Sequence, residues 1–255
     1  MRLGLWSSAG LDVLVYATSS TKAVCPKSYV SGEIYCKSLD ARFRIRGGTD
    51  DLYNVMPGRE ADVDRFIRDH LEAGGSFIDV GANAGYYSVI AGKAVGTTGR
   101  VLAIEPVPST YEALRTNLVL NGLDQVETVR KACWDSRAAI TMHVPVGLFG
   151  MASPLRFVGG TAVPVDGCPL DDLSTGFERV NLLKIDAEYS ELQVLNGARA
   201  TLARTDRIVL ELSKDNEEII RVLHGLSFKT QPMVQYPNYL VAYKDEGAPG
   251  TAPAR

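Results

Sequence analysis

The chain has 255 residues, of which 22% are charged, and a formal net charge of −3. Its length fits one α/β domain with extensions, whose core needs neither a disulfide nor a metal to be stable. The acidic balance excludes an overall basic surface, so we predict no DNA partner. The four cysteines form no Cys-x-x-Cys pair, which leaves zinc and redox motifs without support. We expect a soluble, cytoplasmic protein.

The first 60 residues are predicted to form an N-terminal extension. Residues 1–17 carry an apolar run that Asp12 interrupts and that is too short to span a membrane. This segment is expected to pack on the domain or on a partner subunit, which leaves a homodimer open. Alternating residues at 33–37 and 41–46 predict a β-hairpin.

From residue 61 onward, strands and helices are predicted to alternate, which favours a parallel, doubly wound, Rossmann-like sheet. Ser109 and Glu112 have capping-box spacing and are expected to mark a helix start. The expected elements are a helix over 62–71, a strand over 77–80, a helix from 86 to about 94, a strand over 101–104 and a helix that ends near Gly122.

The second half continues this alternation and ends differently. Residues 145–165, rich in glycine and proline, either line a substrate pocket or form a surface β-excursion. The last two strands are expected to form a closing pair with one strand reversed, giving a seven-stranded sheet with an antiparallel last strand. Such a sheet is typical of class I methyltransferases. The expected elements are strands over 126–129, 139–144, 181–185 and 207–212, helices over 190–202 and 215–226, and strands over 228–233 and 239–243.

The domain is thus predicted to span residues 61–245, with a disordered tail at 246–255. Its most informative motif is Phe77-Ile-Asp-Val-Gly-Ala-Asn-Ala-Gly85, a short strand that breaks into a glycine turn before a helix. A second strand then ends in Glu105 and Pro106, where a carboxylate accepts hydrogen bonds from ribose hydroxyls. The two elements predict a pocket for a nucleoside cofactor.

The residues of the turn favour S-adenosylmethionine over NAD. A dinucleotide motif needs glycine at two positions where this chain has other residues: Asn83, between Gly81 and Gly85, and Tyr86, directly after Gly85. Asp79 would repel a diphosphate, but it suits the ammonium or sulfonium of S-adenosylmethionine. An NAD-binding Rossmann protein stays as an alternative, and so does a turn with a structural role only.

Several motifs together resemble the FkbM family of S-adenosylmethionine-dependent methyltransferases, over roughly residues 42–243. The resemblance implies methyl transfer, with S-adenosylhomocysteine as the product, usually to a hydroxyl of a sugar or another small-molecule acceptor. The chain departs from the family at Tyr189, Ser190 and Ser213, which border the expected acceptor site. The matching motifs are Gly48-Thr-Asp-Asp-Leu52, Phe77 to Ser88, Gly99 to Pro106, Asn117 to Gly122, Leu170-Asp-Asp-Leu173 and Leu183-Lys-Ile-Asp-Ala-Glu188.

Four charged residues are the catalytic candidates. Lys184, Asp186 and Glu188 lie at the end of the 181–185 strand, and Glu211 ends the next strand. Ligands collect at this edge of a doubly wound sheet. Asp186 or Glu188 is predicted to be the general base or to orient the acceptor, with support from Glu211. Asp186 is also expected at the cofactor.

Each of these residues has an alternative role. Lys184 and Asp186 can form a purely structural ion pair. Glu188 can simply favour the start of the following helix. Asp186 and Glu211 offer oxygen ligands to Mg²⁺, but no third ligand is visible, so no metal site is predicted.

Aromatic residues complete the predicted site. The hydroxyl of Tyr86 or Tyr87 is expected to reach the methionine carboxylate or the acceptor, and Trp134 with Asp135 to bound the adenine ring. The acceptor has an alternative, because an RNA or protein methyltransferase shares the donor site. The local basic candidates for such an acceptor are Arg42, Arg44 and Arg46.

Overall fold

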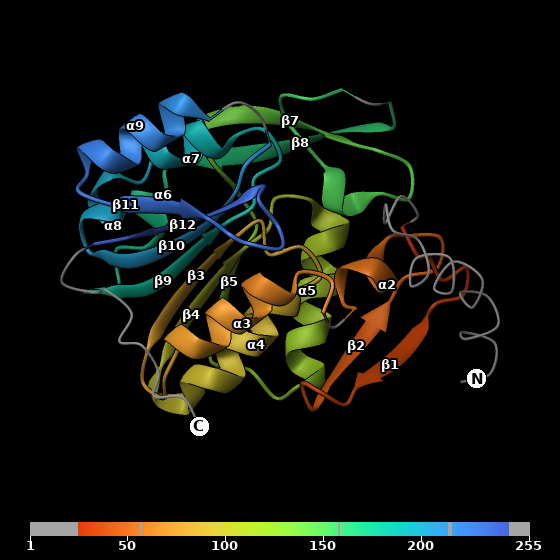
Figure 1. The fold of residues 1–255 in the computed structure, drawn as a ribbon. Coiled ribbons are helices and arrows are strands. Elements are labelled where there is room, and N and C mark those ends of the chain that lie inside the picture. Colours follow the sequence, from red (N-terminus) through yellow and green to blue (C-terminus); the bar gives the residue numbers. More distant parts are fainter. Residues whose placement is uncertain (1–24, 57, 158, 214–215, 245–255) are drawn as a thin grey trace.

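The computed structural model describes residues 25–56, 58–157, 159–213 and 216–244. Its centre is a seven-stranded sheet with the order β11-β12-β10-β9-β3-β4-β5 (Figure 1). Five neighbouring strands are parallel, whereas β12 pairs antiparallel with both β10 and β11, as predicted. The strands are β3 (Ser76–Val80), β4 (Arg100–Ile104), β5 (Val126–Val129), β9 (Val180–Ile185), β10 (Thr205–Glu211), β11 (Lys229–Pro232) and β12 (Tyr239–Tyr243).

The strand order reverses beside β3, and this reversal positions the site. The chain passes from β3 through β4 to β5, and then returns to β9 on the other side of β3. Asp79 of β3 lies opposite Lys184 of β9, and Val80 lies opposite Ile185. The turn after β3 and the residues after β9 therefore meet at the switch point, where doubly wound sheets bind ligands.

Apolar residues cover both faces of the sheet. Phe77 and Ile78 are neighbours in β3, are fully buried and belong to different core clusters, because successive strand residues point to opposite faces. Figure 1 shows α3, α4 and α5 on the side that also carries the hairpin. The helices are α2 (Asp51–Asn54), α3 (Ala61–His70), α4 (Tyr86–Val95), α5 (Pro108–Leu120), α6 (Leu170–Leu173), α7 (Glu191–Asn196), α8 (Arg199–Ala203) and α9 (Glu217–Gly225), with 3₁₀ turns η1 (Gly96–Thr98) and η2 (Phe149–Met151).

The predicted hairpin is present as β1 (Gly32–Cys36) and β2 (Ala41–Ile45), which pair antiparallel. Asn117 of α5 accepts a hydrogen bond from the Arg44 N–H at 2.7 Å and donates one to the Ala84 carbonyl at 2.7 Å. Phe43 is fully buried in the core cluster that contains Tyr86. The hairpin thus shares its core with the domain.

A second sheet, absent from the predicted elements as such, has the order β6-β8-β7. It consists of β6 (Ala132–Cys133), β7 (Ala138–Val144) and β8 (Thr161–Cys168). Both interpretations of residues 145–165 hold in part, because β8 forms an excursion beside β7 while the loop before it lines two cavities.

Two local predictions are wrong. The predicted capping box is absent, because α5 begins at Pro108 and Ser109 lies inside it, without a side-chain cap. Proline is pre-organised for the first helical turn and starts the helix earlier. The predicted helix 190–202 is two helices, which separate at Gly197. A Cβ there would lie 2.0 Å from the Trp134 carbonyl oxygen, so the chain passes too closely for a regular helix.

The predictions for residues 1–17 and for the tail at 246–255 lie outside the described residues, and the division at residue 60 stays a prediction. Within the described ranges, none of the helices combines the length and the apolar character that crossing a membrane requires.

Candidate active site

The turn after β3 packs so closely on its neighbours that two positions require glycine. At Gly81, with φ of 75°, a Cβ would lie 1.8 Å from the Asp186 carbonyl oxygen. At Gly85, with φ of 90°, a Cβ would lie 2.7 Å from Leu114 Cδ1 of α5. Both φ values are unfavourable for other residues. The turn therefore lies tightly between the end of β9 and α5.

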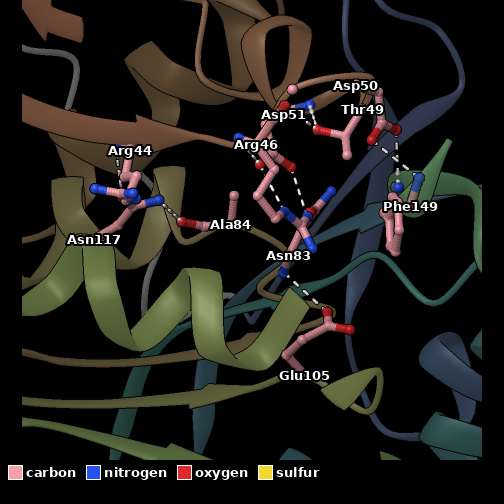
Figure 2. Close-up of polar contacts among 12 residues, drawn as sticks. Arg44, Arg46, Thr49, Asp50, Asp51, Asn83, Ala84, Glu105, Asn117 and Phe149 are labelled. Atoms are coloured by element: carbon pink, nitrogen blue, oxygen red, sulfur yellow. Dashed lines mark hydrogen bonds and ion pairs between the residues drawn. The ribbon is translucent and has the colours of Figure 1, made fainter. Parts of the chain in front are cut away.

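Glu105 supports the same turn from the end of β4. Its carboxylate accepts hydrogen bonds from the Asn83 N–H at 3.0 Å, as Figure 2 shows, and from the Val107 N–H at 2.9 Å. Burial raises the pKa of Glu105 to about 7, although the two backbone hydrogen bonds oppose this shift. The carboxyl group borders a cavity, in the position expected of a ribose-binding acid.

Two cavities meet at the switch point. The first cavity has a volume of about 70 Å³, and the second about 400 Å³. The first is lined by residues that include Glu105, Pro106, Ala132, Cys133, Met142 and Phe149, and the second by residues that include Asn54, Arg59, Tyr86, Tyr87, Lys184 and Glu211. They share Gly81, Asn83, Gly150, Asp186 and Glu188.

Lys184 and Asp186 form an ion pair at the end of β9. The Lys184 ammonium is 1% exposed and lies 3.0 Å from Asp186 Oδ2 and 3.8 Å from Asp79 Oδ1. Burial raises the pKa of Asp186, but the Lys184 charge and hydrogen bonds from Glu211 and Lys184 outweigh burial and lower it overall. Asp186 is therefore ionised at neutral pH. Asp79 accepts a hydrogen bond from Ser88 Oγ at 2.6 Å beneath the turn.

The pKa values of Glu211 and Glu188 are raised, in contrast to the lowered pKa of Asp186. Burial, and then the Asp186 charge, raise the pKa of Glu211 well above its ordinary value. Glu211 shares a hydrogen bond with Asp186 and accepts one from the Tyr239 hydroxyl at 2.9 Å. Burial also raises the pKa of Glu188 to about 8, with the charges of Asp186 and Glu191 adding to the shift. The edge thus combines one carboxyl group whose pKa is lowered, Asp186, with two whose pKa values are raised.

Two buried polar atoms of residues that line the second cavity, the Tyr86 hydroxyl and Asn83 Oδ1, have no hydrogen-bond partner in the part of the chain that the structure describes. Buried polar groups are normally hydrogen-bonded, so such atoms indicate where a polar ligand binds. The other predicted tyrosine, Tyr87, donates a hydrogen bond to Glu60 at 2.6 Å.

The structure brings together most of the predicted site residues. Those that line a cavity are Gly81, Asn83, Tyr86, Glu105, Pro106, Lys184, Asp186, Glu188 and Glu211, and Asp79 and Gly85 support the turn beneath them.

Trp134 and Asp135 lie elsewhere. Neither is among the described residues that line the two cavities. The Trp134 backbone packs against Gly197, and Asp135 is exposed and accepts a hydrogen bond from Ser136. In this region the first cavity is lined instead by Ala132 and Cys133 of β6, the strand that pairs with β8.

Several residues that line the cavities were not predicted from the sequence as site residues. Four of these residues come from the extension: Asp50 lies just before α2, Asn54 lies in α2, and Arg59 and Glu60 form an ion pair of 2.6 Å just before α3. Gly150 comes from the loop before β8. Asp50 belongs to the family motif Gly48 to Leu52, but the sequence of this motif does not indicate which segment Asp50 would contact.

These residues fit S-adenosylmethionine. The tight glycine turn lets backbone approach a ligand, Glu105 borders the first cavity, and unpartnered polar atoms line the second. Carboxylates at the shared edge suit a sulfonium or ammonium group.

The chain is similar to known methyltransferases. It is 25% identical over 202 residues to the hexuronic acid methyltransferase AglP of Haloferax volcanii, covering 75% of this chain and 79% of that protein. It is 28% identical over 153 residues to the methyltransferase sdnD of Sordaria araneosa, of which it spans only 59%. The solved precorrin-6y C5,15-methyltransferase of Geobacter metallireducens superposes with a TM-score of 0.48 at 14% identity, covering 75% of this chain and 91% of that one.

The model of the methyltransferase FkbM domain matches residues 79–230, which is more than half of the chain. The match begins at the strand end that carries Asp79 and includes the glycine turn, Glu105 and the Lys184 to Glu188 segment. The chain therefore belongs to the FkbM family of methyltransferases, enzymes that use S-adenosylmethionine as the methyl donor.

Proposed function

We propose that this enzyme methylates a hydroxyl group of a small metabolite or sugar, with Glu188 accepting the hydroxyl proton and Asp186 orienting the hydroxyl. One observation supports the proposal: Asp186 and Glu188 line both cavities, at the edge where the two cavities meet. The bound cofactor supplies an electrophilic methyl group on sulfur. The chain must align the acceptor oxygen with it and remove a proton.

Glu188 suits the role of base better than Asp186. A general base works best when its pKa lies near the operating pH, and the pKa of Glu188 is raised to about 8. The pKa of Asp186 is lowered, so its carboxylate is a weak base. Asp186 is also held by Lys184 at 3.0 Å, which suits a group that accepts a hydrogen bond and fixes its direction.

The second cavity supports a small, hydroxylated acceptor. Its volume of about 400 Å³ lies in the range of small-molecule sites. Carboxyl, amide and phenol groups line it, and these exchange hydrogen bonds with hydroxyls. The similarity to AglP, which is named as a hexuronic acid methyltransferase, supports a sugar.

The alternative of an RNA or protein acceptor gains no support from Arg44 and Arg46. Arg46 is bound to Asp51 at 2.6 Å and lies over the Phe149 ring. The exposed Arg44 guanidinium lies 3.9 Å from Glu33. Partners of opposite charge reduce the attraction of this face for phosphate.

A labelled-methyl screen tests the proposal. The protein is incubated with methyl-labelled S-adenosylmethionine and a panel of neutral sugars, uronic acids, amino sugars and phenols. Each active acceptor is paired with its deoxy analogue, which lacks the hydroxyl in question. We expect base-stable label on a hydroxyl, with one S-adenosylhomocysteine formed per methyl transferred. Label found as a base-labile ester, or only on RNA or protein, contradicts the proposal.

A further inference from the structure

Asp50 joins two parts of the chain that are about one hundred residues apart. Its Oδ1 accepts a hydrogen bond from the Phe149 N–H at 3.0 Å, and its Oδ2 accepts one from the Gly150 N–H at 2.9 Å. Figure 2 shows this carboxylate pointing at the backbone of Phe149. Asp50 is 3% exposed and lies just before α2, and no step of the proposed chemistry uses it.

The loop that Asp50 holds is closely seated on the extension. A Cβ at Gly147 would lie 2.6 Å from the Gly48 carbonyl oxygen, and one at Gly150 would lie 3.1 Å from Asp50 Oδ2. The Arg46 guanidinium lies 4.5 Å from the centre of the Phe149 ring, within the range of a cation–π contact. The whole tip of the loop therefore packs on residues 46–50.

The base of the same loop is fixed independently. His143 and Ser153 exchange backbone hydrogen bonds of 2.9 and 3.1 Å, and Ser153 Oγ donates to the Glu188 carbonyl at 2.5 Å. The tip carries Phe149 and Gly150, which line the first cavity, and Gly150 lines the second as well. Asp50 thus holds the tip, which forms a wall of the cofactor site and adjoins the acceptor cavity.

We propose that Asp50 is a positioning residue that fixes Phe149 and Gly150 as a wall of the two cavities and thereby retains the bound cofactor. Two adjacent backbone N–H groups need two acceptor oxygens, and the carboxyl group of Asp50 offers one oxygen to each. An asparagine offers one oxygen, and its NH₂ group would face the second N–H. This inference rests on the cofactor alone and is independent of the acceptor.

The substitution Asp50→Asn tests this role. Hydrogen–deuterium exchange of residues 145–152 is measured in the cofactor-free protein, and S-adenosylmethionine dissociation by stopped-flow mixing. We expect faster exchange in this segment and dissociation about tenfold faster, the consequence of losing a buried hydrogen bond. The KM for the cofactor should rise by about the same factor, while kcat at saturation changes less than about threefold.

Asp64→Asn is the matched control. Asp64 lies on α3 in an ion pair with Arg68 at 3.0 Å and is not among the residues that line either cavity, so its substitution should leave exchange in residues 145–152 and cofactor dissociation unchanged.

A second variant keeps the test decisive if Asp50→Asn does not fold. In Gly150→Ala the new Cβ would lie 3.0 to 3.1 Å from Asn83 Nδ2, Asn54 Nδ2 and Asp50 Oδ2, so the tip and the Asp50 side chain can no longer keep their present separation. It should show the same faster exchange and faster dissociation. The proposal is overturned if exchange in the folded variant is unchanged, or if exchange rises while cofactor dissociation stays at the wild-type rate.

Discussion

Glu188 has a backbone conformation that few residues other than glycine adopt. Its φ is 42°, and that of the following Tyr189 is 77°. Hydrogen bonds hold this strained segment, because the Tyr189 N–H donates to Glu191 Oε1 and to Ser213 Oγ, each at 3.0 Å. Such strain is found most often at functional sites. Ser213 therefore supports the backbone next to the proposed base.

Substitutions of the site carboxylates should have distinguishable effects on turnover and on cofactor affinity. Asp186→Ala and Glu188→Ala are expected to lower turnover by about a hundredfold or more at saturating cofactor, the usual contribution of a general base. Glu105→Ala should first weaken cofactor affinity, because it removes the acceptor of the Asn83 and Val107 N–H groups. Calorimetry with S-adenosylhomocysteine and turnover at saturating substrate measure the two effects. Normal turnover in both the Asp186 and Glu188 variants would show that the base lies elsewhere.

Glu188 should also make stability depend on pH. Its pKa is raised from 4.5 to about 8 in the folded protein, so between these values the folded state binds more protons than the unfolded state. The free energy of unfolding then falls as pH rises through this range. The Tm of Glu188→Gln should match wild type near about pH 5 and exceed it by about 3 °C or more near about pH 9. A Tm difference that is the same at both pH values contradicts the shift.

At the scale of elements, the turn between β3 and α4 depends on its close approach to β9. Gly81 has both an unfavourable φ and no space for a side chain, whereas Gly96, with φ of 66°, has nothing within 4 Å. The motif predicted the turn because glycine is required by local geometry. The distance to Asp186 was not predictable, since β9 is about one hundred residues further along the chain.

Substituting Gly96 and Gly81 separates the cost of an unfavourable backbone conformation from the cost of a steric clash. Gly96→Ala should lose about 1–3 kcal/mol, because φ of 66° with ψ of −164° is a conformation that almost only glycine adopts. Gly81→Ala should lose at least about 2 kcal/mol more, because its Cβ would also displace the Asp186 carbonyl. Urea unfolding followed by fluorescence measures both values. Equal losses would show that the strand ends move apart easily.

At the scale of the whole molecule, the hairpin and the domain fold on one core. Asn117 is fully buried and links three segments, because it bonds the Arg44 N–H of β2 and the Ala84 carbonyl of the motif turn from its position in α5. The extension therefore presents Asp50 and Asn54 to the cavities in a fixed position.

Asn117→Ala should destabilise the protein by about 2–4 kcal/mol, because it leaves a buried N–H and a buried carbonyl without partners. Unfolding should remain a single transition, measured by urea titration with both fluorescence and circular dichroism. Asn196→Ala, which removes an exposed contact to Arg199, is the control and should cost less than about 0.5 kcal/mol. A separate early transition would show that the hairpin unfolds on its own.

Local patterns in the chain were enough to predict the strands of the central sheet, its reversed last strand and the glycine turn with Glu105. Hydrophobic periodicity and glycine geometry depend on neighbouring residues, so they can be read without a structure. The break at Gly197, the wall formed by Ala132 and Cys133, and the contact of Asp50 with the loop before β8 were decided only by the tertiary structure. Each depends on residues far apart in sequence, and such contacts leave no local pattern.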